Sequence, residues 1–99
     1  MNIQQLTDVI NAFVQRKGWY AEDSPFPQTP RNIAISVAVE AAEILEHFQF
    51  GETCANRDEL ADELADVAMY LLQLAYLTDI DLEQAIHTKL QKNEHRSWD

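Results

Sequence analysis

The sequence predicts an all-α fold, a four-helix bundle that forms a single domain over residues 1–99. Apolar residues recur at helical spacing through most of the chain. A composition of 46% hydrophobic residues with only 2 Gly and 3 Pro fits helices better than a turn-rich β-sandwich or a disordered tail. A chain of 99 residues holds one hydrophobic core rather than two.

Capping residues mark the predicted helix starts. Thr29 before Pro30 fits an N-cap with proline at the first helical position, and Asn56 and Asp81 each precede a Glu or Gln by three residues, as in a capping box. The connector at residues 19–30 contains all 3 prolines and is expected to be rigid and non-helical. The expected helices cover about residues 2–17, Pro30 to Phe50, the Asn56 cap to about Thr78, and the Asp81 cap to about Asn93.

The charge of the chain excludes several classes of partner. Lys and Arg total 7 against 17 Asp and Glu, a net charge of −10 that repels polyanions, so we expect no nucleic acid polymer as a partner. The most apolar run, Val67–Leu77, is shorter than the ~20 residues that span a bilayer, and the N-terminus lacks the features of a secretion signal. We therefore expect no membrane partner. Cys54 is alone and cannot form an internal disulfide, which favours a cytoplasmic location.

Two pairs of carboxylates fall on faces that are otherwise apolar. At about 100° per residue, Glu40 and Glu43 lie on the apolar arc of the second predicted helix, and Glu63 and Asp66 lie on that of the third. The full arcs are Ile33, Val37, Glu40, Glu43, Ile44 and His47 on one helix, and Leu60, Glu63, Asp66, Val67, Tyr70 and Leu74 on the other. Four carboxylates are therefore expected to converge on one seam.

Such a seam requires positive charge, because burying unpaired carboxylates costs several kcal/mol. The basic residues on these helices, Arg31 and Arg57, lie near the N-terminal ends and away from the acids. Oxygen ligands without clustered Cys or His select Mg²⁺, with Mn²⁺ as a substitute. The alternative is that the acids are protonated in the core, or that the helical phase drifts until they reach solvent.

Other polar and aromatic residues have two possible roles each. Lys89, Asn93 and Arg96 continue the apolar stripe of the fourth helix, where they could reach phosphates or form a solvated last turn. Trp19 and Phe50, with Tyr20 and Phe26, could stack on a base or cover the core as a hydrophobic plug, and Tyr70 could close a pocket or fill it. The three histidines, His47, His87 and His95, lack metal-ligand spacing and are expected to be surface or packing residues.

Taken together, the motifs resemble the MazG-like all-α nucleoside triphosphate pyrophosphohydrolases, most closely the short single-domain members similar to dCTP pyrophosphatase. The resemblance is carried by E-A-A-E at Glu40–Glu43, by E-L-A-D at Glu63–Asp66 with Tyr70 after it, and by K-L-Q-K-N-E-H-R at Lys89–Arg96. G-W at Trp19 and P-R-N at Pro30–Asn32 extend it over nearly the whole chain.

The resemblance implies a Mg²⁺-dependent enzyme that converts a nucleoside triphosphate to the monophosphate and pyrophosphate, as a dimer or a dimer of dimers. The implied metal ligands are Glu40, Glu43, Glu63 and Asp66, and the implied substrate contacts are Trp19, Lys89, Asn93 and Arg96. Phe50 stands where dCTP-preferring relatives carry Trp, and Gln28 stands near where they carry His, so base and sugar preference stay open. House-cleaning of non-standard nucleotides and control of a deoxynucleotide pool are both compatible with this site.

For catalysis, Glu40 or Glu43 is expected to orient or deprotonate the attacking water, and the sequence does not choose between them. Apolar reverse faces rich in alanine on the second and third helices predict self-association. The alternative to an enzyme is a non-catalytic acidic helical module that dimerises or binds a partner helix.

Overall fold

Four helices form the structure, a computed structural model that describes residues 1–97. They are α1 (Ile3–Arg16), α2 (Pro30–Glu46), α3 (Arg57–Leu77) and α4 (Leu82–Glu94), and residues 1–97 contain no strand. The predicted all-α, four-helix fold class is confirmed. Within the described range, no helix is both long and apolar enough to span a membrane.

Side-chain caps begin the helices where the sequence predicts. The Thr29 side chain accepts a hydrogen bond from the Asn32 N–H at the start of α2, and Asn56 accepts from the N–H groups of Asp58 and Glu59 at the start of α3. Asp81 accepts from the Gln84 N–H to begin α4. These bonds satisfy backbone donors that have no partner within the helix, which fixes the helix starts.

The end of α2 differs from the prediction. The helix ends at Glu46, and residues 47–50 form turns instead of the continuous helix to Phe50 expected from the sequence. The His47 N–H bonds to the Ile44 carbonyl and the Phe48 N–H to the Leu45 carbonyl, so the α-helical bonding pattern tightens to three-residue spacing there. Phe50 is therefore carried on a turn, with 95% of its surface exposed.

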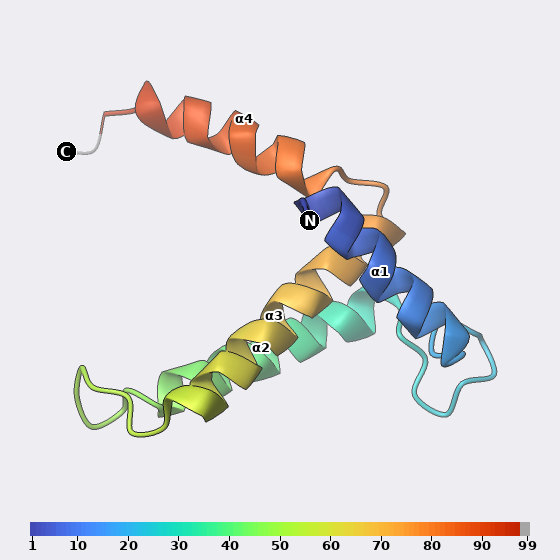
Figure 1. Cartoon of the computed structure of the whole chain (residues 1–99), viewed down its shortest axis with the longest axis horizontal. Coiled ribbons are helices and arrows are strands. Elements are labelled where there is room, and N and C mark those ends of the chain that lie inside the picture. The colour runs from blue at the N-terminus through green and yellow to red at the C-terminus, as the bar shows by residue number, and fades with distance from the viewer. Residues whose placement is uncertain (98–99) are drawn as a thin grey trace.

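Figure 1 shows α2 and α3 as an antiparallel hairpin, with α1 crossing the C-terminal end of α3. The N-terminal end of α1 lies beside the start of α4, and these two helices are in contact. From that junction α4 extends away from the hairpin (Figure 1). The four helices of one chain thus form an open arrangement in which α2 and α3 pair along their length.

The core lies where α1, the start of α2 and the second half of α3 meet. Its buried apolar side chains are Ile10, Val14, Ile33, Leu72 and Ala75. Apolar burial at this junction is the main force that holds α1 on the hairpin.

Buried polar side chains tie the proline-rich connector to this core. Asn11 donates from Nδ2 to the Thr7 carbonyl at 2.8 Å and accepts a hydrogen bond from the Tyr20 hydroxyl. Gln73 on α3 donates from Nε2 to Oε1 of Gln28 at 2.5 Å. Asn11 and Gln73 are only 2% and 3% exposed, so these bonds are shielded from water. Both ends of the connector are thereby anchored to helices.

We predict that Asn11→Ala lowers the free energy of unfolding by about 1–3 kcal/mol, because the buried Asn11 amide is lost and the half-buried Tyr20 hydroxyl loses its acceptor. Urea denaturation followed by circular dichroism at fixed protein concentration measures the loss. The matched control is Gln4→Ala on the same helix, whose hydrogen bond to Asp8 is exposed. Equal effects of the two substitutions would contradict a stabilising role for the buried network.

Candidate functional site

The four predicted carboxylates lie along the seam between α2 and α3. Glu40, Glu43 and Glu63 are half-buried, and Asp66 is exposed. Partial burial raises the pKa of the Glu40 carboxyl above its ordinary value, and the negative charge of Glu43 and a hydrogen bond to it raise the pKa further. The charges of Asp66 and Glu63 add to the shift. The hairpin therefore brings both carboxylate pairs into one electrostatic neighbourhood.

The chemistry of these donors fits a hard divalent cation. Carboxylate oxygens are the ligands that Mg²⁺ and Mn²⁺ prefer. A cation between the two pairs would offset the repulsion that helps to raise the pKa of Glu40. Over residues 1–97, no three His, Cys, Asp or Glu side chains converge closely enough to hold a metal ion as they stand. Coordination would require the carboxylates to turn toward a common point, and their role as metal ligands stays a prediction.

His47, expected to be a surface or packing residue, contacts one of the carboxylates. Its Nε2 lies 2.5 Å from Oε2 of Glu63, and its Nδ1 lies 3.6 Å from Sγ of Cys54. The side chains of His47 and Glu63 are 11% and 23% exposed, so the pair is partly shielded from water. The sequence could have linked His47 to the carboxylates, because His47 lies four residues after Glu43 on the same helical arc. The other two histidines, His87 and His95, are exposed.

An acidic hollow of about 540 Å³ lies at the loop end of the seam. Its lining side chains include Glu43, Glu63, His47 and Phe50. Further carboxylates from the end of α2, the loop and the start of α3 also line it, namely Glu46, Glu52 and Glu59. The surplus of negative charge makes this hollow unfavourable for an anion without a cation.

A second hollow, of about 580 Å³, lies at the connector end of the hairpin. Ser36 and Tyr70, which line it, stand four residues from Glu40 and Asp66 respectively, about 6 Å along each helix axis. The connector contributes apolar and aromatic walls, and two amide side chains add polar groups. The remaining lining residues are Pro25, Phe26, Pro27, Gln28, Asn32, Ile33 and Ile35.

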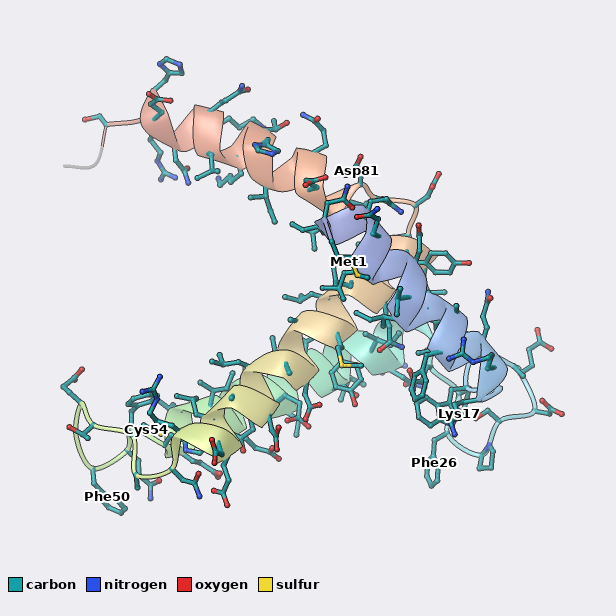
Figure 2. All side chains as sticks on the ribbon, viewed as in Figure 1. Met1, Lys17, Phe26, Phe50, Cys54 and Asp81 are labelled. Atoms are coloured by element: carbon teal, nitrogen blue, oxygen red, sulfur yellow. The ribbon has the colours of Figure 1, made fainter. Side chains whose placement is uncertain are left out.

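The aromatic residues expected to contact a substrate do not lie together in the structure. Figure 2 shows Phe26 and Phe50 at opposite ends of the α2–α3 hairpin, so they cannot face the same small ligand within one chain. Trp19 packs edge-on against Phe13, with ring centroids 5.6 Å apart, and is not among the lining residues of either hollow. Tyr70 does line the connector-end hollow. The sequence did not single out the amides Gln28 and Asn32 as lining residues, because no periodicity marks the connector residue Gln28 and Asn32 lies off the predicted apolar arc in the first turn of α2.

The structure does not bring Lys89, Asn93 and Arg96 to the carboxylates of the same chain. Lys89 and Asn93 lie on α4, and Arg96 comes just after it. This helix points away from the hairpin and contacts α1 (Figure 1). The turn before α4 includes Asp79 at φ 57°, a left-handed conformation that redirects the chain. The apolar stripe of α4 indicated that these residues share one face of the helix. It could not indicate which other helix that face lies against.

We predict that Glu40→Gln raises the melting temperature of the protein in the presence of EDTA, because a neutral amide removes the charge that its neighbours oppose. The raised pKa means that wild-type Glu40 supports folding fully below its ordinary value of about 4.5, and that this support is lost as pH rises through the folded value. The advantage of Glu40→Gln should therefore grow with pH in thermal melts. Glu46→Gln, at an exposed position of the same helix, is the control. An advantage independent of pH would contradict the electrostatic cause.

Comparison with known proteins places this geometry in a family. The MazG-like family matches residues 35–98, which include both carboxylate pairs and α4. The chain is 33% identical over 76 residues to dCTP pyrophosphatase 1 of Mus musculus, and equally so to that of Homo sapiens. These alignments take in 68% of this chain and 45% of each relative, so the chain spans less than half the length of the curated relatives that it matches.

A solved structure shares the fold. The crystal structure of a pyrophosphatase from Archaeoglobus fulgidus DSM 4304 superposes with a TM-score of 0.77 at 32% sequence identity, covering 93% of this chain and 88% of that one. The family match covers well over half of the present chain. The chain therefore belongs to the MazG-like family.

Proposed function

We propose that this chain is a Mg²⁺-dependent nucleoside triphosphate pyrophosphohydrolase, which converts a nucleotide or deoxynucleotide to its monophosphate and pyrophosphate. The observation that carries the proposal is the placement of two carboxylate pairs beside a hollow with aromatic and amide walls, with Glu40 and Asp66 one helical turn from its lining residues. The names of the relatives, a dCTP pyrophosphatase and a pyrophosphatase, support the same reaction class.

The connector-end hollow suits the nucleobase of such a substrate. A nucleobase fits the connector-end hollow, where Phe26 and Tyr70 offer aromatic faces and Gln28 and Asn32 offer hydrogen-bonding amides. The triphosphate then extends along the seam toward the carboxylates. A bound Mg²⁺ would supply charge neutralisation between these carboxylates and the phosphate oxygens. The acidic hollow is the less suitable place for the base, because glutamates dominate its lining, whereas no carboxylate of the described residues lines the connector-end hollow.

Glu40 is the carboxylate best suited to take a proton from the attacking water. Its raised pKa brings it closer to the operating pH of a cytoplasmic enzyme, where a general base is most effective. The neighbouring charge of Glu43 contributes to the raised pKa and so favours proton uptake by Glu40. Water then adds to a phosphorus atom as the bond between the first and second phosphates breaks, releasing pyrophosphate and the nucleoside monophosphate.

A second copy of the chain completes the proposal. The hairpin exposes several large apolar side chains, namely Ile35, Val39, Leu45, Leu64 and Leu71. Exposed apolar surface on one hairpin favours association. Association as a dimer or a dimer of dimers would cover this surface and would let Lys89, Asn93 and Arg96 of one copy approach the seam of another.

Glu63→Gln should reduce Mg²⁺-dependent pyrophosphate release by roughly 100-fold or more, because one carboxylate charge at the seam is lost. The assay uses a panel of ribo- and deoxyribonucleotides with and without Mg²⁺, and circular dichroism verifies that the helices are retained. Asp62→Asn, an exposed acid on the same helix, is the matched control.

Full activity of Glu63→Gln would contradict the assignment of Glu63 as a metal ligand. Absence of release by the wild-type protein with every nucleotide, together with a melting temperature unaffected by Mg²⁺, would instead favour a non-catalytic acidic helical module.

Light scattering at micromolar concentration should detect a dimer or larger assembly, and Leu64→Asp should shift it toward monomer by placing a charge on the outer face of α3. Val9→Asp, an equally exposed apolar position on α1, is the control. A strictly monomeric wild-type protein would contradict self-association through the hairpin.

A further inference from the structure

His47, which contacts Glu63, has bonding partners in α2, in α3 and in the loop between them. His47 caps the C-terminal end of α2, and its backbone N–H is bonded to the Ile44 carbonyl. Its ring reaches Glu63 on α3 through Nε2 and Cys54 in the loop through Nδ1. Cys54 Sγ also lies 3.3 Å from the Asn56 carbonyl, at the residue that caps α3. Figure 2 shows Cys54 in the loop at this end of the hairpin.

The Nε2 atom of His47, which faces Glu63, must act as the hydrogen-bond donor. An ionised carboxylate only accepts hydrogen bonds, so Nε2 of His47 must carry the hydrogen at the 2.5 Å contact. If the Cys54 thiol donates to Nδ1, the ring is neutral with its hydrogen on Nε2. If the thiol donates to the Asn56 carbonyl instead, Nδ1–H can donate to sulfur and the ring carries both hydrogens. Either arrangement leaves Nε2–H directed at Glu63.

This bond occupies one of the two carboxylate oxygens. Oε2 of Glu63 accepts from His47, and residues 1–97 offer no other hydrogen bond to this carboxylate. Within that range Oε1 has no such partner and can bind an ion, and the bond to His47 restrains rotation of the carboxylate. Carboxylates that bind metal ions are characteristically oriented in this way by a second hydrogen bond.

We propose that His47 is a positioning residue, which fixes the orientation of Glu63 so that one oxygen is presented to a divalent cation. This inference rests on the proposed function, and it assigns His47 no contact with the substrate or the ion. Cys54 acts on the other ring nitrogen and sets the plane of the imidazole.

Two substitutions separate the two contacts of the ring. The amide nitrogen of His47→Gln can take the place of Nε2 and keep the bond to Glu63, whereas that of His47→Asn can replace only Nδ1, beside Cys54. The probe is Mn²⁺ added to nucleotide-free protein, with the free ion measured by electron paramagnetic resonance. His87→Leu, at an exposed histidine of α4, is the control, and circular dichroism verifies the helices.

His47→Asn should weaken Mn²⁺ binding by about 10- to 100-fold, the usual cost of losing a group that orients a ligand, while His47→Gln stays close to wild type. In turnover, the Mg²⁺ concentration for half-maximal rate should rise for His47→Asn with a smaller change in kcat. Equal Mn²⁺ affinities for the wild type and His47→Asn, or equal losses in the Asn and Gln variants, would overturn the positioning role alone. Wild-type protein that binds no Mn²⁺ would overturn the proposed function as well.

Discussion

Mutual repulsion among carboxylates is the constraint on which the rest of this structure depends. Two helices that pair along their length would be more stable with apolar side chains at every facing position, yet α2 and α3 each place two acids there. The pKa of Glu40 is raised first by its partial burial and then by the negative charge of Glu43, as this placement requires. Local stability is reduced at this point, and the fold compensates with caps at the helix starts and an apolar core at the other end of the hairpin.

The position of the core explains how the conflict is tolerated. Ile33 and Leu72 are buried near the end of the hairpin where α1 crosses, and the carboxylates lie farther along toward the open loop. The stabilising core and the carboxylates therefore lie at different positions along the hairpin. The polar bonds of Asn11 and Gln73 extend the stable part to the connector, so the wall formed by Phe26 and Gln28 stands on an ordered base.

Sequence reasoning was most successful where the cause is local. Caps such as Thr29 and Asn56 act within three residues, and the arcs containing Glu40 and Glu63 follow from helical geometry alone. It failed at the end of α2, where a helix to Phe50 was expected but the three-residue bonds after Ile44 end the helix sooner. Long-range contacts were also beyond its reach. The approach of Cys54 to His47 depends on the path of an irregular loop, and the direction of α4 depends on the turn at Asp79.

The divergence of α4 has a consequence for the acidic seam of the same chain. Flexible cationic side chains placed beside four carboxylates would form ion pairs with them, and such tethered ammonium or guanidinium groups compete with a dissolved metal ion at very high effective concentration. Because α4 leads Lys89 and Arg96 away from the hairpin, the chain cannot inhibit itself in this manner. The acids of an isolated protomer remain accessible to a mobile ion from solution.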